Sequence, residues 1–383
     1  MRTRSAVLQR LEAPTPYADS KPLVVEELEL EEPHAGELLV RVAAAGLCHS
    51  DLSVLNGSRP RPTPMALGHE GAGIVERVGP GVFDVAEGDH VVLTFVPSCG
   101  QCDRCSSGNP AMCRPAAAAN GAGVMLGGGM RFKRADGTPV HQHLGVSAFA
   151  ERTVVARGSA VVIDPAVPLD IAVLVGCGVL TGVGAVLNTG GVRPGDSVVV
   201  FGMGGVGLSA IMGAALASAT PIIAVDPVPA KRELALQLGA TAAFAPDEAE
   251  EGVRQLTGGG ADFAVECVGA APVMEQAYRC TGPAGTTIGV GLPHPSKQLT
   301  IPALSIVGEG RTIKGSYMGS ASPQRDVPRL LKLWQAGRLP LEKLRAGNLA
   351  LDAVNEAMDT LHGGETVRQL LLPHGEAELR TAE

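Results

Sequence analysis

The sequence is poor in aromatic residues and has no excess of positive charge. Of 383 residues, one is Trp, three are Tyr and seven are Phe, so the apolar residues are mainly Ala, Val, Leu and Ile. Lys and Arg number 31 against 39 Asp and Glu, a formal net charge of −8, and no basic run is present that would neutralise a phosphate backbone. We therefore expect no nucleic-acid partner.

The sequence also lacks an export signal. The first ten residues are basic but contain no apolar stretch of signal-peptide length, which predicts an uncleaved, cytoplasmic protein. Residues 197–225 carry no charge and are long enough to span a bilayer. Several glycines and Pro221 interrupt this run, however, and its ends at 198–201 and 222–225 are typical of two buried strands around a helix. We therefore expect no membrane segment.

Glycine and proline, at 50 and 28 residues, divide the chain into short elements. Residues 1–178 show strand signals separated by these breakers, which indicates a mainly β domain. Residues 179–317 alternate strands and helices, a pattern that predicts an α/β fold with a doubly wound parallel sheet. Helical signals and a short apolar strand at 367–372 occupy residues 318–383. The alanines at 116–119 and the glycines at 127–129 are expected in a surface loop.

A glycine-rich motif follows the predicted strand at 198–201. Residues 202–207 fit G-x-G-x-x-G, with Gly202 for the tight turn, Gly204 for close backbone approach to a pyrophosphate and Gly207 for helix packing; Gly205 and Val206 begin the helix. Asp226 ends the next strand, where a carboxylate accepts hydrogen bonds from an adenosine ribose and repels a 2′-phosphate. The motif therefore predicts a dinucleotide site that prefers NAD. Lys231 either crosses the ribose or is a solvated helix lysine.

Four cysteines stand close together in the sequence, at Cys99, Cys102, Cys105 and Cys113. Thiolates at this spacing supply the four ligands of a tetrahedral zinc with little loss of chain entropy. Four protein ligands leave no open coordination position, so this site would be structural. Two alternatives remain: a disulfide pair, which a cytoplasmic location disfavours, and an iron–sulfur cluster, which the spacing partly resembles.

A second set of metal-binding residue types is dispersed along the chain. Cys48, His69 and Cys177 would each be interpreted alone as a buried core residue. Together they form a Cys₂His set, which leaves the fourth position of a zinc ion free for water or substrate. A metal in such a site polarises a carbonyl or lowers the pKa of an alcohol. The other two cysteines, Cys267 and Cys280, are expected to pack in the core.

In this order, the motifs resemble the zinc-dependent medium-chain alcohol dehydrogenases (medium-chain dehydrogenase/reductases) over essentially the whole chain. The resemblance rests on residues 68–73, the four-cysteine segment, residues 176–182, the motif at 202–207 and residues 367–368. Residues 131–145 are similar to the long-loop branch, which includes animal-type alcohol dehydrogenases and thiol-dependent formaldehyde dehydrogenases. The resemblance implies a GroES-like catalytic domain at 1–178 and 318–383, a Rossmann NAD-binding domain at 179–317, and a homodimer, with a tetramer as the alternative.

The resemblance also implies roles for individual residues. Cys48, His69 and Cys177 would bind a catalytic zinc, with Asp51 and Glu70 beside them and Glu70 as a transient ligand. Ser50 would take the alcohol proton and pass it to the nicotinamide ribose. The other implied roles place His49 and Arg368 at the pyrophosphate, Thr181, Val290 and Leu292 at the nicotinamide, and Phe95, His143 and Leu144 in the substrate pocket.

Two positions depart from familiar members of the family. Ser53 stands where animal-type enzymes often end the proton relay with a histidine, so proton exit would use water or His49. Arg59 stands where glutathione-dependent formaldehyde dehydrogenases carry an aspartate that meets the thiol cofactor. Arg59 either favours a polar or anionic substrate at the pocket mouth or lies on the surface.

These observations predict an NAD-dependent dehydrogenase that interconverts alcohols and aldehydes or ketones by hydride transfer, with one zinc in each of the two sites. The alternative within enzymes is a dehydrogenase of a mycothiol or glutathione adduct of formaldehyde. A nucleotide-binding protein that has lost its chemistry is a further alternative, although Cys48, Ser50, His69 and Cys177 are all present. A zinc-dependent nucleic-acid module is disfavoured by the acidic charge.

Overall fold

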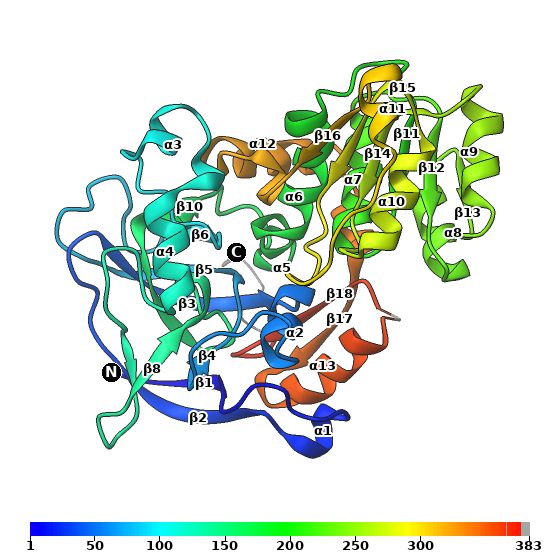
Figure 1. The fold of residues 1–383 in the computed structure, drawn as a ribbon. Coiled ribbons are helices and arrows are strands. Elements are labelled where there is room, and N and C mark those ends of the chain that lie inside the picture. The colour runs from blue at the N-terminus through cyan, green and yellow to red at the C-terminus, as the bar shows by residue number, and fades with distance from the viewer. Residues whose placement is uncertain (365, 377–383) are drawn as a thin grey trace. The chain divides into compact units, whose positions relative to one another are not determined.

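The computed structural model describes residues 1–364 and 366–376, and the chain divides into two compact units (Figure 1). Unit 1 contains Met1–Cys177, Ser322–Trp334 and the described residues from Leu341 on. Unit 2 contains Gly178–Ala321 and Gln335–Pro340. The α/β fold class predicted from the sequence is confirmed by a mainly β unit 1 and a parallel-sheet unit 2.

Unit 1 is built on a small barrel and a larger sheet. The closed barrel has the strand order β1-β2-β7-β8-β4, and its strands are β1 (Arg2–Leu8), β2 (Leu23–Leu30), β7 (Phe132–Lys133), β8 (Pro139–Gln142) and β4 (Met65–Ala66). The sheet has the order β10-β6-β5-β3-β18-β17, with β9 also paired to β3; its strands are β3 (Glu37–Gly46), β5 (Glu70–Val78), β6 (His90–Leu93), β9 (Arg152–Ala156), β10 (Ala160–Val162), β17 (Arg345–Ala350) and β18 (Arg368–Leu372). The last strand thus returns to the sheet formed by the first half of the chain.

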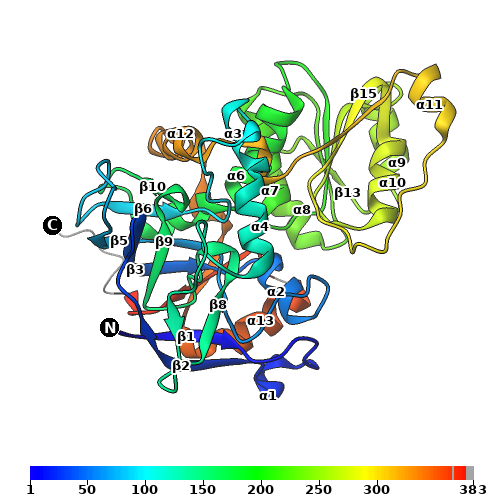
Figure 2. The same ribbon diagram turned by 60° about the vertical axis from the view of Figure 1, so that its left-hand side comes forward.

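Short helices surround these strands. They are α1 (Tyr17–Ser20), α2 (His49–Leu55), α3 (Asp103–Ser106), α4 (Arg114–Ala122), α5 (Leu169–Ala172), α12 (Pro323–Gln335) and α13 (Val354–Gly363), with 3-10 turns that include η1 (Pro110–Met112), η2 (His143–Gly145) and η4 (Val173–Gly176). Helices α1 and α13 lie side by side (Figures 1 and 2), because the Asp359 carboxylate accepts hydrogen bonds from the backbone N–H groups of Tyr17 and Ala18.

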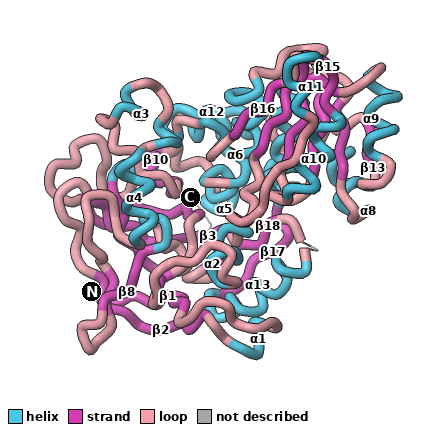
Figure 3. The backbone as a smooth tube through the Cα atoms, in the orientation of Figure 1, coloured by secondary structure: helices cyan, strands magenta, loops and turns pink. Residues whose placement is uncertain are grey.

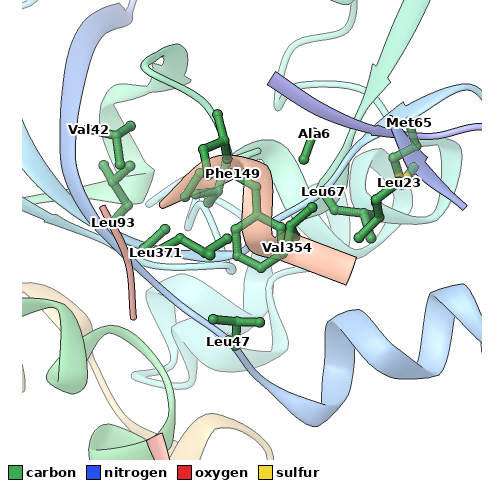
Figure 4. Packing of buried hydrophobic residues seen from close by; sticks show 14 of the residues in the cluster. Ala6, Leu23, Val42, Leu47, Met65, Leu67, Leu93, Phe149, Val354 and Leu371 are labelled. Carbon is green, nitrogen blue, oxygen red and sulfur yellow. The ribbon is translucent and has the colours of Figure 1, made fainter. Parts of the chain in front are cut away.

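The main core of unit 1 joins elements that are far apart in the sequence. Figure 4 shows Phe149 among side chains from β1, β3, β6, α13 and β18, including Val354 and Leu371. Each of these three residues is completely buried. Burial of a side chain of this size contributes about 1.5–3 kcal/mol. The C-terminal segment is therefore part of the hydrophobic core that supports the N-terminal strands.

Unit 2 contains one six-stranded parallel sheet. Its order is β13-β12-β11-β14-β15-β16, and its strands are β11 (Val198–Phe201), β12 (Ile222–Val225), β13 (Ala242–Phe244), β14 (Ala261–Glu266), β15 (Thr281–Gly289) and β16 (Thr312–Gly315). Strands β11 and β12 are buried throughout, as expected for β-branched runs in a sheet covered on both faces. In sequence order this sheet is 3-2-1-4-5-6, the doubly wound arrangement that binds dinucleotides where the strand order reverses.

Helices cover the sheet of unit 2, as Figure 3 shows. They are α6 (Gly178–Gly184), η5 (Ala185–Gly190), α7 (Gly205–Leu216), α8 (Pro229–Gln237), α9 (Ala249–Thr257), α10 (Ala271–Cys280) and α11 (Ala303–Gly308). The uncharged residues 197–225 form β11, α7 and β12, so the predicted strand–helix–strand pattern is confirmed. Within the described part of the chain no single helix is long and apolar enough to cross a membrane. The two segments Leu169–Gly176 and Gly178–Gly190 reach that length and apolar composition together, but the chain bends sharply between them.

Unit 2 begins at α6, because this helix packs against other elements of unit 2. A Cβ atom on Gly182 would lie 2.2 Å from the Val206 carbonyl oxygen, and one on Gly184 would lie 2.5 Å from the Gly319 carbonyl oxygen. The helix from Gly178 on therefore packs closely against α7 and against residues 318–320. Unit 2 accordingly begins at Gly178 and extends to Ala321, a few residues beyond the boundary at 317 expected from the sequence.

The alanine-rich segment is a correction to the sequence-based expectation. Residues 116–119 lie inside helix α4, not in a surface loop, and Ala116 is fully buried. Proline in the first turn, a run of alanines and a left-handed Gly123 at the C-cap together favour this helix. The glycines at 127–129 do lie in an exposed turn, as expected.

Candidate functional site

Unit 1 brings two cysteines, a histidine and a glutamate together. Cys48 precedes α2, His69 directly precedes β5, Glu70 begins β5, and Cys177 follows η4. Their candidate ligand atoms all lie within 4.8 Å of one another, and all four residues are buried. The pairing of Gly46 with Glu70 in strands β3 and β5 places these segments side by side. The three dispersed metal-ligand types predicted from the sequence are thus neighbours in space.

Close backbone packing is needed to form this cluster. Gly68, next to His69, has φ +90°, and a Cβ atom there would lie 2.4 Å from the backbone nitrogen of Phe149. A Cβ atom on Gly46 would lie 2.5 Å from Glu70 Oε2. Both positions therefore require glycine, because a side chain would displace the strands that carry the cluster.

The imidazole of His69 is fixed on one side and makes no hydrogen bond to the described residues on the other. Its Nδ1 lies 3.0 Å from Asp51 Oδ1, whereas its Nε2 is buried without a hydrogen bond. The rings of Phe95 and His143 each meet it edge-on, with centroids 5.6 Å away. A carboxylate that accepts from Nδ1–H leaves the Nε2 lone pair available to a metal.

Charge at the cluster is strongly coupled. Burial, which raises the pKa of a carboxyl group, is outweighed at Asp51 by His69 and His143, so its pKa lies below its ordinary value. A hydrogen bond from Cys177 lowers the pKa of the Cys48 thiol and raises that of Cys177. These interactions favour a thiolate at Cys48, the form that binds metal ions.

Glu70 and Arg368 form a buried ion pair beside the two thiols. Arg368 Nη2 donates to Glu70 Oε2 and Nη1 donates to the Leu47 carbonyl oxygen, while Glu70 Oε1 lies 3.7 Å from His69 Nε2 without a hydrogen bond. Burial, opposed mainly by Arg368, raises the pKa of Glu70 to about 8. No motif in the sequence indicates this pair, because its two residues lie 298 positions apart. The contact of Arg368 with a pyrophosphate stays a prediction.

This donor set fits zinc. Two cysteine sulfurs and one imidazole nitrogen are the ligands of open, catalytic zinc sites. His69 Nε2 and Glu70 Oε1 are buried polar atoms that no protein group satisfies, which is costly unless another ligand is bound. The chemistry of the residues present is therefore that of a zinc site with a fourth position free.

The four-cysteine segment forms a second cluster in unit 1, which we call the cysteine lobe (Cys99, Cys102, Cys105 and Cys113). The sulfur pairs Cys99–Cys105 and Cys102–Cys113 are each 4.0 Å apart. Four ligands at about 2.3 Å in a tetrahedron place the sulfurs about 3.8 Å apart. The backbone N–H groups of Cys99 and Cys102 also donate to lobe sulfurs, at 3.3 Å in each case. None of the eight cysteines, all of which lie among the described residues, forms a disulfide. The geometry suits a closed tetrahedral zinc site.

In unit 2, the glycine-rich motif lies at the carboxyl end of β11. Gly202 has φ +88°, and a Cβ atom on Gly207 would lie 1.7 Å from the Gly202 carbonyl oxygen. Gly204 caps α7, and a Cβ atom there would meet nothing within 4 Å. Asp226 follows β12, is buried, and accepts hydrogen bonds from the backbone N–H groups of Met203 and Val228 at 2.7 and 2.9 Å. The turn and the helix N-terminus thus form an open backbone cradle of the kind that binds a pyrophosphate.

The other residues assigned to a nucleotide are spread over unit 2. Thr181 is a buried residue of α6, which packs on α7. Val290 follows β15 and is buried, whereas Leu292 is half-exposed. Lys231 is half-buried on α8. The structure keeps these residues in the unit that carries the cradle, and their roles stay predictions.

Helix α2 carries the residues predicted for proton transfer. Ser50 Oγ lies 3.8 Å from Cys48 Sγ. His49 is exposed at the start of the helix. Ser53 Oγ donates to the His49 carbonyl oxygen at 2.8 Å, a bond inside the helix that engages its hydroxyl hydrogen. Ser50 is therefore close to the cluster, whereas Ser53 is not part of it.

Three of the residues expected in a substrate pocket lie at or next to His69, and the place of Arg59 in that pocket stays a prediction. Phe95 and His143 flank His69, and Leu144 is buried beside His143 in η2. Arg59 lies in the segment after α2, where its backbone N–H donates to the Ser53 carbonyl oxygen. His143 Nδ1 lies 3.1 Å from Asp51 Oδ1, a contact that no spacing in the sequence indicated.

Comparison with known proteins covers both units. Residues 34–165 match the family described as alcohol dehydrogenase GroES-like domain, and residues 205–336 match zinc-binding dehydrogenase. The chain is 43% identical to an NDMA-dependent alcohol dehydrogenase of Amycolatopsis methanolica, over 97% of this chain and 99% of that one. It is 38% identical to an S-(hydroxymethyl)glutathione dehydrogenase of Paracoccus denitrificans, over 97% and 100%. The crystal structure of a benzyl alcohol dehydrogenase of Acinetobacter calcoaceticus is similar with a TM-score of 0.90, at 33% identity over 97% and 99%.

Proposed function

The chain belongs to the zinc-dependent medium-chain alcohol dehydrogenase family, and on this premise we propose that it interconverts small alcohols and their aldehydes or ketones with NAD. Members of this family are oxidoreductases that act on CH–OH groups. The observation that carries the proposal is the buried cluster of Cys48, His69 and Cys177, in which His69 Nε2 makes no hydrogen bond to any described residue. A protein that bound a nucleotide but catalysed no reaction would not need to bury two cysteines and a histidine together.

Zinc held by Cys48, His69 and Cys177 would supply a Lewis acid that lowers the pKa of an alcohol, and NAD on the cradle of unit 2 would supply a hydride acceptor. Asp51 holds the Nδ1–H of His69 and so fixes which ring nitrogen faces the metal. Ser50 would take the proton of the substrate hydroxyl, a role supported by the 3.8 Å distance between its Oγ and Cys48 Sγ. Because Ser53 donates within its own helix, we assign the proton's next acceptor to water or to His49.

The cysteine lobe would hold a second, structural zinc. Its four sulfurs satisfy all four positions of a tetrahedral ion, so no position remains for substrate. The lobe's contribution would be to stability of the surrounding loop, because closing a loop through a metal removes entropy from the unfolded chain.

NAD, not NADP, is the proposed coenzyme because of Asp226. Its carboxylate is buried at the end of β12 and already accepts two backbone hydrogen bonds, which hold it in place. A fixed negative charge there repels a 2′-phosphate and accepts hydrogen bonds from a 2′-hydroxyl. Lys231 on the next helix is a second candidate contact with the ribose.

The test of the proposal is a spectrophotometric screen at 340 nm. Primary, secondary, aromatic and hydroxy-acid alcohols are supplied with NAD or NADP, and the reactions are repeated with NDMA added, since one relative is named for its dependence on it. NAD reduction with at least one alcohol class is the expected result. A strong preference for NADP would contradict the role of Asp226, and no reaction with any alcohol would overturn the proposed substrate class.

A thiol-adduct formaldehyde dehydrogenase is the second candidate. The relative named S-(hydroxymethyl)glutathione dehydrogenase favours it, whereas Arg59 in place of an aspartate argues against glutathione. In that reaction a thiol adds to formaldehyde, and the adduct loses a hydride to NAD and a proton to give an S-formyl thiol. Formaldehyde oxidation is therefore measured without thiol, with glutathione and with mycothiol; strict dependence on one thiol would replace the simple alcohol as the proposed substrate.

We also propose that two copies associate through the edge of unit 2. Strand β16 ends the sheet, so one side of its backbone has no partner strand among the described residues. Leu304 and Val307 on neighbouring α11 are 81% and 84% exposed. Pairing with a second copy would satisfy the strand edge and cover these side chains. Light scattering is expected to give a dimer, and Leu304→Glu with Val307→Glu a monomer; a wild-type monomer would exclude this interface.

A further inference from the structure

His143 lies in a short loop that is held in an unusual conformation. The residues after it include two non-glycine residues with left-handed backbone, Leu144 at φ 52° and Ser147 at φ 50°. The Ser147 hydroxyl accepts from the His143 backbone N–H at 2.9 Å and donates to the Ala66 carbonyl oxygen at 2.8 Å. Residues other than glycine rarely adopt such backbone angles unless the surrounding structure enforces them. The position of the His143 ring is therefore determined by the fold.

The loop brings His143 to the carboxylate that orients His69. Nδ1 of His143 lies 3.1 Å from Asp51 Oδ1, the same oxygen that lies 3.0 Å from Nδ1 of His69. The approach of His143 is within ion-pair distance but lacks the alignment of a hydrogen bond. A ring nitrogen lone pair would be repelled by this oxygen, so Nδ1 of His143 carries the hydrogen.

Asp51 has few other restraints. Its Oδ2 is buried without a hydrogen bond, and among the described residues only His69 and His143 place a side-chain nitrogen at ion-pair distance from the carboxylate. The two imidazole rings also meet edge-on, 5.6 Å apart and 84° inclined. Removing His143 would therefore leave His69 as the one side-chain partner of the carboxylate among the described residues, and would uncover one side of the His69 ring.

We propose that His143 is a positioning residue for the metal ligand His69, acting through Asp51. The inference rests on the proposed zinc site at Cys48, His69 and Cys177. It differs from the role implied by family resemblance, which places His143 only in the substrate pocket. Groups that orient a metal-binding histidine typically change metal affinity by 10–100-fold when removed.

The experiment compares two amides that imitate different ring nitrogens. In His143→Asn the side-chain amide occupies the position of Nδ1, and in His143→Gln it reaches the position of Nε2. His141→Phe is the matched control, because His141 lies two residues away and its Nδ1 faces the Gly123 carbonyl oxygen. Each variant is loaded with Co²⁺, its d–d spectrum is recorded, and metal affinity is measured by competition with a chelating dye. Subtracting the spectrum of Cys177→Ala isolates the site from the cysteine lobe.

We expect His143→Gln to bind the metal about ten-fold more weakly and to shift the d–d bands, with His143→Asn and His141→Phe close to wild type. Equal affinity and spectra for His143→Gln and wild type, with a change only in the KM for alcohol, would overturn the inference and leave His143 as a pocket-lining residue. Equal weakening in the Asn and Gln variants would also overturn it. A wild-type protein whose spectrum matches that of Cys177→Ala would instead contradict the zinc site itself.

Discussion

Replacing Gly204 by alanine separates nucleotide binding from folding. Gly204 has φ −82° and ψ −171°, angles that alanine adopts, and its Cβ would meet nothing within 4 Å. Gly207, three residues on, is the matched comparison: its Cβ would lie 1.7 Å from a backbone oxygen. The same methyl group is therefore added once to the open side of the cradle and once to its packed side.

The two substitutions have different expected magnitudes. In Gly204→Ala the smaller entropy of the unfolded chain stabilises the folded protein by about 0.4–1 kcal/mol. Alanine is a poorer helix N-cap than glycine, which destabilises the folded protein by a few tenths to about 1 kcal/mol. The free energy of unfolding should therefore be nearly unchanged. In Gly207→Ala the backbone must move, which costs roughly 3 kcal/mol. The added methyl of Gly204→Ala would enter the space proposed for the pyrophosphate, with a loss of about 1–3 kcal/mol in binding, or roughly 5–150-fold in Kd.

Calorimetric titration with NAD measures the Kd. Thermal unfolding with and without NAD measures how much bound NAD stabilises the folded protein. At an NAD concentration of about 100 times the wild-type Kd, binding stabilises the wild-type protein by about 2.7 kcal/mol, and a variant that binds 30-fold more weakly by only about 0.9 kcal/mol. The reasoning is refuted if Gly204→Ala binds NAD with wild-type affinity, or if it unfolds as readily as Gly207→Ala without the nucleotide.

Three further outcomes are expected. Glu37→Gln, which breaks the buried pair with Arg131, should lower the free energy of unfolding by about 3–5 kcal/mol in a urea titration, whereas the exposed Glu27→Gln should change it by less than about 1 kcal/mol; similar losses would contradict the burial argument. Removal of metal by a chelator should make the cysteine lobe react with a thiol reagent at pH 7.5, and mass mapping identifies the labelled cysteines. Cys280, whose pKa is raised to about 12 by burial, should stay unlabelled until the protein unfolds. Labelling of Cys280 in the folded protein would contradict this expectation. Asp226→Asn should reduce the NAD-to-NADP ratio of kcat/KM about ten-fold or more, and an unchanged ratio would remove this residue from coenzyme selection.

Much of unit 2 was predictable because its signals are local. The uncharged residues 198–201 and 222–225 are short β-branched runs, and small residues between them allow α7 to pack against α6. The alanines at 116–119 form part of α4 because alanine has a high helix propensity, although their low complexity alone is typical of a loop. Residues 318–321 belong to unit 2, where Gly319 packs closely against Gly184 of α6. The sequence alone does not show this contact.

The candidate site was only partly predictable. Cys48, His69 and Cys177 come from three separate segments, so their residue types indicate a Cys₂His set, but their spacing alone does not show that they meet in space. The contact between His143 and Asp51 depends on left-handed backbone at Leu144, an uncommon conformation for a non-glycine residue. Long-range contacts that rest on one such loop have no periodic or motif signal.

The most direct test of the account is a zinc count combined with alcohol oxidation for Cys177→Ala, with Cys280→Ala as the matched control for loss of a buried thiol. We expect about two zinc ions per chain in the wild type and in Cys280→Ala, and about one in Cys177→Ala, whose NAD-dependent oxidation should fall by about 10³-fold or more. Full activity or an unchanged zinc content in a folded Cys177→Ala protein would contradict the assignment of this cluster as the catalytic centre.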